Sequence, residues 1–380
     1  MNKRVFKSLR LAALLVLLGA AVVYVWPQVS PVVRAIAGEW DDTNFDIRSV
    51  EMSEIRSGGP PKDGIPSIDE PKFVSQSDAA DWLHPREPVI ALRVGETARA
   101  YPIQILTWHE IVNDTLGGTP VSVTFCPLCN ASIAFARKHD GVVLDFGTTG
   151  RLRLSDMVMY DRQTQSWWQQ FTGEAIVGDM TGEVLTQIPS QIIAFEDFTT
   201  LYPSGDVLSN DTGYSRDYGR NPYAGYDDIN QSPFLFDGKI DNRLPPMERV
   251  LSVVDGDETL LFPFSAVADA PIISLEFVET PLVVFAHRNM RSPLDRSRIA
   301  DSRDIPAAAA FDRRIDGRNL NFVYENGRVT DTETGSEWGA TGLALNGPLK
   351  GKHLKQIDGG VHFAFAWLAF DPSAEIYRAN

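Results

Sequence analysis

An internal repeat constrains the fold of this chain more than any other feature of its sequence. Segments 161 residues apart match in three successive stretches: Glu87–Ile90 with Glu248–Leu251, Tyr101-Pro102 with Phe262-Pro263, and Thr119–Val121 with Thr280–Leu282. Further on, the pattern Asp-x-x-Thr-x-Ser-x-Trp begins at Asp161 and again at Asp331. Each copy has short runs of apolar and polar residues separated by turn residues, which is typical of β-hairpins. A module of about 120 to 130 residues that occurs twice predicts two similar lobes.

We therefore expect an α+β, β-rich fold of two similar lobes, preceded by an N-terminal membrane helix. The expected parts are a signal anchor at 1–27, a stalk and lead-in at 28–85, a first lobe at 86–208, a crossover at 209–246 and a second lobe at 247–378.

The crossover has no repeated counterpart and is rich in tyrosine: Tyr214, Tyr218, Tyr223 and Tyr226. A connection of this length without secondary structure is unusual in a compact protein unless it packs or functions. We interpret it as an ordered segment that covers a cleft, and a plain mobile linker is the alternative.

The N-terminus has the charge pattern of a targeting segment. Four basic residues within the first ten precede the apolar run 11–26, which as a helix spans about 24 Å and is short but workable for a bilayer. A cleaved secretory signal, with Ala35-Ile36-Ala37 as its cleavage site, is the alternative. The basic flank predicts a single-pass inner-membrane protein with its bulk extracytoplasmic, which is the periplasm in a bacterium.

The charge and apolar content of the chain limit the kinds of protein it can be. Hydrophobic residues make up 43%, enough for a sizeable core. The formal net charge of -15 argues against nucleic acid as a partner, because a phosphate backbone is repelled by such a surface.

Both cysteines of the chain lie in Cys126-Pro127-Leu128-Cys129. Thiols at this spacing form a disulfide, attack one, or bind a soft metal. In the 161-residue register His287 stands opposite Cys126 and Met290 opposite Cys129, so the second lobe has no CxxC. A cysteine pair confined to one lobe favours a functional site over a structural cross-link that both lobes would need. The stretch after Cys129 fits a helix or a strand, and a helix there would lower the thiol pKa through its N-terminus.

Two further groups of polar residues are candidates. His109 and Glu110 precede the cysteines, and an imidazole near a thiol acts as its base or, when protonated, lowers its pKa. A histidine hydrogen-bonded to a backbone carbonyl is the structural alternative. Arg151, Arg153, Asp156, Asp161 and Arg162 offer an anion site, but we favour an exposed, salt-linked surface.

Metal binding is an alternative use of the cysteines. Structural zinc normally takes four protein ligands and the chain has no second CxxC, so the support for zinc is weak. Two thiolates with His109 or His287 suit Cu(I).

The chain resembles the domain-of-unknown-function family 3179 over about residues 85–378. The resemblance lies in Tyr101-Pro102, Trp108–Glu110 through Asn113-Asp114, Thr124–Cys129, Met159–Arg162, Trp168-Gln169 and Thr172–Ala175. Some members carry selenocysteine at the CxxC-like motif, which implies redox chemistry. This chain departs from the family pattern at Asn130, where glycine is expected.

The leading hypothesis is a membrane-anchored extracytoplasmic thiol-redox protein, and as an enzyme it would be a thiol–disulfide oxidoreductase. Cys126 would attack, Cys129 would resolve, His109 would tune Cys126, and Glu110 would orient His109. This function needs no cofactor, and its partner would be an extracytoplasmic protein or a small thiol. The alternatives are a Cu(I) or zinc binding protein using the same cysteines and a noncatalytic scaffold with a local disulfide.

Overall fold

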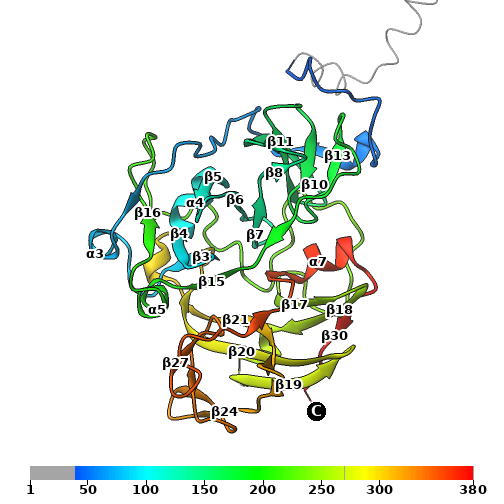
Figure 1. Ribbon diagram of the computed structural model, residues 1–380. Helices are drawn as coiled ribbons and strands as arrows, with labels where there is room; N and C mark the ends of the chain where they lie inside the picture. The colour runs from blue at the N-terminus through cyan, green and yellow to red at the C-terminus, as the bar shows by residue number, and fades with distance from the viewer. Residues whose placement is uncertain (1–38, 269, 380) are drawn as a thin grey trace, which may run out of the picture. The chain divides into compact units, whose positions relative to one another are not determined.

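A computed structural model describes residues 39–379 apart from Asp269. The chain divides into two units, with the boundary between Thr43 and Asn44. In the first unit, the Thr43 N–H donates a hydrogen bond to the Trp40 carbonyl oxygen at 3.1 Å. The helices and strands given below all belong to the second unit (Figure 1).

The first lobe follows a lead-in of four short elements. The lead-in contains η2 (Met52–Glu54), β1 (Ile55–Ser57), β2 (Phe73–Val74) and α3 (Gln76–Ala79). The lobe contains β3 (Pro88–Val94), β4 (Thr97–Pro102), α4 (Ile103–His109), β5 (Ile111–Leu116), β6 (Thr119–Cys126), β7 (Ala131–Ala136), β8 (Lys138–His139), β9 (Val142–Val143), β10 (Phe146–Arg153), β11 (Asp156–Asp161), β12 (Trp167–Gln169), β13 (Ala175–Val177), β14 (Gln187–Ile188), β15 (Ser190–Ala194), α5 (Phe195–Leu201) and β16 (Asp206–Leu208).

The second lobe repeats this order of elements. It contains β17 (Arg249–Asp255), β18 (Glu258–Pro263), α6 (Phe264–Val267), β19 (Ile272–Phe277), β20 (Thr280–Arg291), η3 (Ile299–Asp301), β21 (Asp304–Asp312), β22 (Arg314–Ile315), β23 (Arg318–Asn319), β24 (Phe322–Glu325), β25 (Arg328–Asp331), β26 (Glu337–Trp338), β27 (Ala344–Asn346), β28 (Lys355–Gln356), β29 (Val361–Phe363), α7 (Ala364–Phe370) and β30 (Glu375–Ile376).

The sheets of the two lobes share the same strand order. The order β15-β3-β4-β16-β2 corresponds to β29-β17-β18-β30, β14-β7-β6-β5 to β28-β21-β20-β19, and β1-β10-β11-β12-β13 to β24-β25-β26-β27. The lead-in strands β1 and β2 add an edge to two of the first-lobe sheets. The prediction of a β-rich protein is therefore confirmed.

The predicted N-terminal membrane helix is corrected. The segment 1–27 lies outside the described residues. Within residues 39–379, no helix is long and apolar enough to cross a membrane. The longest described helices, α4, α5 and α7, have seven residues each, or about 10 Å at 1.5 Å per residue, against a hydrocarbon core of about 30 Å. The structure thus gives no support to a single-pass anchor, nor to the inner-membrane location that depended on it.

The repeated Asp-x-x-Thr-x-Ser-x-Trp pattern is a structural motif. The Trp168 indole N–H donates to the Asp161 carboxylate at 2.9 Å, and Trp338 donates to Asp331 at the same distance. A Cβ on Gly178 would lie 2.7 Å from the side chain of Ser166, and a Cβ on Gly347 would lie 2.7 Å from the backbone of Ser336. The motif therefore closes the same tight loop in both lobes.

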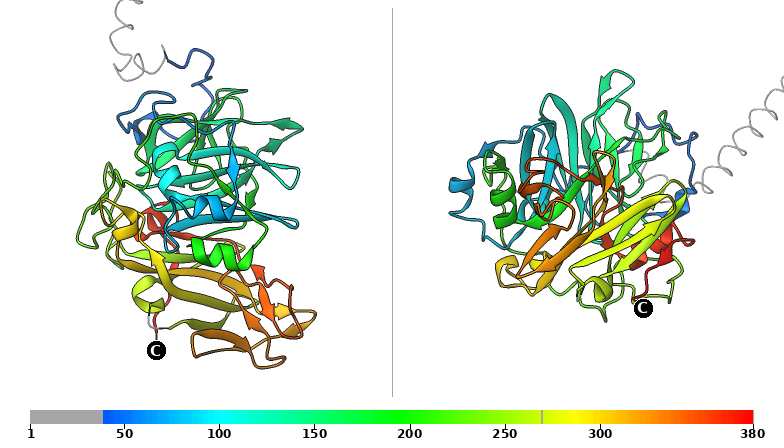
Figure 2. Two further views of the ribbon diagram at one scale, coloured as in Figure 1. Left: turned by 90° about the vertical axis from the view of Figure 1, so that its left-hand side faces the viewer. Right: turned by 60° about the horizontal axis from the view of Figure 1, so that its bottom comes forward.

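The lobes contact each other through equivalent strands. The first-lobe strand β7 contacts β29, and its counterpart β21 contacts β15, the first-lobe counterpart of β29. Helix α7 of the second lobe reaches the first, where Phe370 stacks on Phe171 with a centroid distance of 4.6 Å. Figure 2 shows the blue-to-green strands of the first lobe packed along the yellow-to-red strands of the second. One apolar cluster at this junction contains both cysteines together with Phe363 and Phe365.

Candidate functional site

The CxxC motif lies in the turn between two paired strands. Cys126 ends β6 and pairs with Ala131, the first residue of β7, so the four residues between them form a hairpin loop. Asn130 closes this loop with φ 51, in the left-handed region that glycine and asparagine tolerate best. This explains why asparagine is tolerated at a position where glycine was expected. A strand follows the motif, so no helix N-terminus acts on the thiols.

Both thiols are free and are buried in the apolar cluster. Cys126 is 1% exposed and Cys129 is 0% exposed. The same cluster contains Ile111 and Met157, with Tyr223 of the crossover packed against it. Solvent therefore does not reach either sulfur directly.

The β10–β11 hairpin brings a buried acid to the cysteines. Strand β11 begins at Asp156, directly after a two-residue turn in which Leu154 (φ 53) and Ser155 (φ 66) both adopt left-handed backbone. Asp156 is 0% exposed, and one of its oxygens and the two sulfurs all lie within 4.8 Å of one another. The Cys129 thiol also lies 3.3 Å from the Ser155 carbonyl oxygen.

Asp156 was misread from the sequence as part of an exposed charged surface. Asp156 and Asp161 are both fully buried, whereas Arg162 lies at the surface and pairs with Asp69 at 2.8 Å. Neither oxygen of Asp156 makes a hydrogen bond of standard geometry with another described residue, although the Gln169 amide and the Phe171 N–H lie near enough to lower the pKa of the carboxyl group. An unpaired buried carboxyl costs free energy, and such groups gather at functional sites.

The pKa values of the two thiols are shifted in opposite directions. Burial alone raises the pKa of Cys126, but the Cys129 thiol and the N–H groups of Cys129, Met157 and Leu128 donate to its sulfur and bring its pKa below the usual value. Burial, reinforced by the neighbouring Cys126 sulfur, raises the pKa of Cys129 well above the usual value. The Cys129 proton has two acceptors, and it goes to the Cys126 sulfur when that sulfur is ionised, because a charged acceptor binds more strongly. Cys126 is therefore the more acidic thiol of the pair.

The two carboxyl groups near Cys126 both have a raised pKa. Burial raises the pKa of Asp156 well above its usual value, and the Cys126 charge adds to this effect. The same two causes, in the same order, raise the pKa of Glu110. Glu110 follows α4 with φ 60. Among these three groups, the pKa of Cys126 is lowered and those of the two carboxyl groups are raised.

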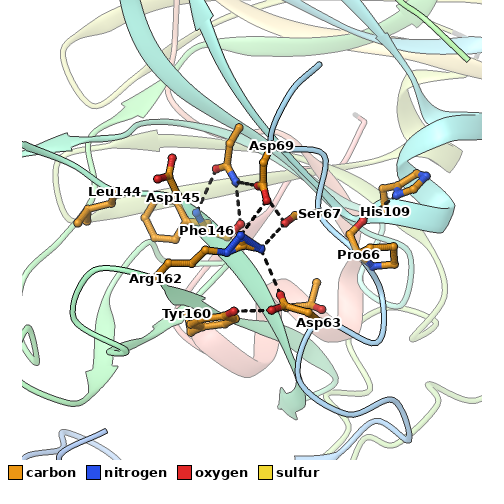
Figure 3. A network of polar contacts seen from close by, with 12 residues as sticks. Asp63, Pro66, Ser67, Asp69, His109, Leu144, Asp145, Phe146, Tyr160 and Arg162 are labelled. Carbon is orange, nitrogen blue, oxygen red and sulfur yellow. Dashed lines mark hydrogen bonds and ion pairs between the residues drawn. The ribbon is translucent and has the colours of Figure 1, made fainter. Parts of the chain in front are cut away.

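His109 is held by groups other than the cysteines. Its Nδ1–H donates to the Pro66 carbonyl oxygen at 2.7 Å, a contact drawn in Figure 3, and its Nε2 accepts from the Tyr218 hydroxyl at 2.6 Å. Burial lowers the pKa of His109, although the bond to Pro66 works against this effect. His109 therefore lies next to Glu110 in sequence but is oriented by Pro66 and Tyr218.

The lead-in around Pro66 is fixed to the first lobe by a polar network. The Tyr160 hydroxyl donates to Asp63 at 2.5 Å, and the Arg162 guanidinium reaches Ser67 at 2.9 Å (Figure 3). This network fixes the backbone carbonyl that orients His109.

The second-lobe residues at the CxxC register lie elsewhere. His287 lies on β20 beside Asp197, in a pocket that is also lined by Trp338. Met290 packs in a different apolar cluster with Val89 and Ile305. Among the described residues, the metal-ligating side chain that groups with the two cysteines is Asp156, not a histidine.

The crossover covers the cysteine turn. The Tyr226 hydroxyl donates to the Leu128 carbonyl oxygen at 3.1 Å, and the Ser155 hydroxyl donates to the Phe234 carbonyl oxygen at 2.5 Å. At the α4 end, the Trp108 indole N–H donates to the Arg220 carbonyl oxygen at 3.1 Å. The crossover is thus attached to both the His109 end and the cysteine end of the site.

The second lobe holds the other side of the turn. The Phe363 N–H donates to the Cys129 carbonyl oxygen at 2.9 Å. The buried Arg249 guanidinium lies 3.4 Å from the Asn130 amide oxygen and 2.9 Å from the carboxylate of Asp227 in the crossover.

The sequence contains one signal for Asp156 that the repeat analysis did not use. The first-lobe hairpin runs from Phe146, paired with Asp161, whereas its counterpart runs from Phe322, paired with Asp331, so the first-lobe hairpin is six residues longer. The connection between β20 and β21 in the second lobe is longer than its first-lobe counterpart. The residues it adds outnumber those missing from the second-lobe hairpin, so the distance between matching residues still increases along the repeat. The extension carries the turn that places Asp156.

These features define a class of protein with two β-rich lobes and a buried thiol pair in one lobe. Over residues 62–374 the chain matches the model of a family of proteins of unknown function, DUF3179, and it belongs to that family. The resemblance seen in the sequence is therefore confirmed. No curated protein and no solved structure matches the chain.

Proposed function

We propose that this protein carries out thiol–disulfide exchange, with Cys126 as the attacking thiol and Cys129 as the resolving thiol. Two observations carry the proposal: the two sulfurs lie within 4.8 Å of each other in the β6–β7 turn, and the donor groups around Cys126 lower the pKa of its thiol. Such donors favour the thiolate, which is the nucleophile of disulfide exchange. Cys129 keeps its proton until it is needed for resolution.

The burial of the cysteine pair limits the size of the molecule that can react with it. A protein disulfide reaches Cys126 only if the crossover segment around Tyr226 moves away. A small disulfide or thiol has a lower steric demand, so we propose a small thiol compound as the partner. The chemistry uses protein groups alone and needs no cofactor. Nucleic acid is an unsuitable partner at a net charge of -15.

Mixed-disulfide trapping tests the two roles. Reduced Cys129→Ala protein is expected to accumulate a stable adduct with 2-hydroxyethyl disulfide on Cys126, measured by intact-protein mass spectrometry. Reduced Cys126→Ala protein is expected to form none on the same timescale, and the double variant is the control for nonspecific addition. Failure of both thiols in the folded wild-type protein to react contradicts the proposal.

Metal analysis separates this function from its rival. Protein purified without oxygen is expected to contain no stoichiometric copper or zinc. Stoichiometric metal that disappears in the double Cys→Ala variant would replace the redox proposal with a metal-binding one. A loss of stability in the double Cys→Ala variant, together with wild-type cysteines that do not exchange with disulfides, would favour the scaffold.

A further inference from the structure

We propose that the Asp156 carboxyl group is the proton store of the thiol pair. It gives a proton to the thiolate that leaves when Cys126 attacks a disulfide, and it takes the proton of Cys129 before that thiol attacks. The inference rests on the proposed thiol-redox function and adds a third participating residue to it.

The position of Asp156 is the first support. Its carboxyl oxygen lies within 4.8 Å of both sulfurs, and the side chain is fully buried. Neither oxygen makes a hydrogen bond of standard geometry with another described residue, although the Gln169 amide and the Phe171 N–H lie near enough to lower the pKa of the carboxyl group. A buried carboxyl group so weakly bound is rare in a structural role, because it loses hydration and gains little in return.

The hairpin that carries Asp156 is the second support. Its turn places Leu154 and Ser155 in left-handed backbone, which is unfavourable for these residues, and leucine lacks the short polar side chain that makes this backbone tolerable. The counterpart turn in the second lobe uses Asn326 and Gly327, which accept positive φ at low cost. The lobe with cysteines therefore has the longer and more strained hairpin.

The other acid–base groups of the site are less suitable. Both ring nitrogens of His109 are engaged, with Pro66 and Tyr218. Glu110 interacts with the Cys126 charge but is not part of the group of atoms that lie within 4.8 Å of one another. Asp156 is the acid with an oxygen within 4.8 Å of both sulfurs.

The proposed steps balance in protons and in charge. In the proposed reduced site Cys126 is the thiolate, Cys129 the thiol and Asp156 the acid, so the site starts with two protons and one negative charge. Cys126 attacks a disulfide R–S–S–R, the substrate S–S bond breaks, and the leaving thiolate takes the Asp156 proton. Asp156 then takes the proton of Cys129, and the Cys129 sulfur attacks the Cys126 sulfur. The second thiolate leaves with that proton from Asp156.

The products are two R–SH molecules and the Cys126–Cys129 disulfide, so the protein thiols are oxidised and the substrate is reduced by two electrons. The site ends with one carboxylate, so its charge is the same before and after. A constant charge avoids the cost of several kcal/mol that a new uncompensated ion would carry in a buried site.

Proton counting in the wild-type protein tests this balance without any substitution. Reduced protein, in which absorbance at 240 nm has first shown that Cys126 is a thiolate, is oxidised with 2-hydroxyethyl disulfide at pH 7 in weak buffer containing an indicator dye. The products are protonated thiols, so the expected uptake from solvent is close to zero protons per disulfide formed. An uptake close to one overturns the inference, because the site would then supply only the Cys129 proton.

The Asp156→Asn variant tests the residue itself. Its expected uptake is one proton, and closure of the Cys126–Cys129 bond from the mixed disulfide is expected to slow at least about tenfold at pH 7, in line with the loss of a general base. The closure rate is expected to rise with pH in the variant, because hydroxide replaces the lost carboxylate. Closure at the wild-type rate with unchanged proton uptake overturns the inference.

Glu87→Gln is the matched control. Glu87 is another buried first-lobe acid, but it is bonded to Gln104 at 3.1 Å and belongs to no cysteine contact. This variant is expected to keep wild-type closure and proton uptake. The readouts also separate the two proposals: if no mixed disulfide forms in any variant, the redox function fails, whereas normal formation and closure in Asp156→Asn contradict only the proton store. If that variant does not fold, the wild-type proton count decides.

Discussion

The Asp227 carboxylate forms an ion pair with the Arg249 guanidinium at 2.9 Å, with both side chains almost fully buried. The pair joins the crossover to β17 directly behind the cysteine turn, because Arg249 also lies 3.4 Å from the Asn130 amide oxygen. Asp227 further binds Arg303 at 2.8 Å and accepts from the Ser292 hydroxyl. The crossover is therefore fixed to the second lobe at the place where it covers the thiols.

We expect Asp227→Asn to loosen this cover. Removing one partner of a buried ion pair leaves Arg249 uncompensated, which costs about 3 to 5 kcal/mol of unfolding free energy. The rate of Cys126 alkylation by iodoacetamide in the folded protein is expected to rise at the same time. Asp241→Asn removes an exposed pair with Arg243 in the same crossover and is expected to cost less than about 1 kcal/mol. Equal alkylation rates in both variants would show that the Asp227 pair does not control access.

The buried Glu87 side chain makes stability depend on pH. Burial raises its pKa from 4.5 to about 7, despite a hydrogen bond from the His84 N–H. Between these two pH values the folded protein keeps a proton that the unfolded chain loses. The unfolding free energy is therefore unaffected by Glu87 below pH 4.5, and the full loss of stability is reached above pH 7. Glu87→Gln is expected to increase the unfolding free energy by about 3 kcal/mol at pH 8 and very little at pH 4. Urea unfolding at the two pH values measures this, and an equal effect at both would contradict the assignment.

The two thiols are expected to titrate in opposite directions when their partner is removed. Cys129 donates to the Cys126 sulfur, so Cys129→Ala is expected to raise the pKa of Cys126. The Cys126 sulfur raises the pKa of Cys129, so Cys126→Ala is expected to lower it, although burial keeps it above the usual value. Thiolate absorbance at 240 nm measures both shifts. A pKa of Cys126 unaffected by Cys129→Ala would contradict the hydrogen bond between the thiols.

The repeated tryptophans provide a test of the duplicated motif. Trp168→Phe and Trp338→Phe each remove an indole hydrogen bond to a buried carboxylate at 2.9 Å. A hydrogen bond to a charged group contributes about 1.5 to 3 kcal/mol, so both variants are expected to lose at least this much stability in denaturant unfolding. Trp338→Phe is expected to leave Cys126 alkylation unchanged, because Trp338 lies in a second-lobe cluster that contains neither cysteine. An altered thiol reactivity would contradict that independence.

The family, the β-rich class and the repeat were determined by the sequence alone. Hairpins leave local marks, since Gly95 and Gly256 occupy the same turn position with φ 60 and 63 and alternating residues flank them. The cysteine pair was also evident, because two residues of spacing place both sulfurs at one turn. These features depend on neighbours in sequence, so periodicity and spacing record them.

The surroundings of the thiols were decided by tertiary structure. Asp156 reaches the cysteines through a hairpin extension, and its charge in sequence resembled that of surface residues such as Arg162. His109 was near the cysteines in the chain, but Pro66 and Tyr218, 43 and 109 residues away, take its nitrogens. Burial and hydrogen bonding between distant segments set the acidity of a group, and no local pattern records which segments will meet. The membrane anchor was inferred from composition, and no described helix supports it. The sequence thus specified the thiol pair, and the packing of two lobes and a crossover supplied the proton chemistry around it.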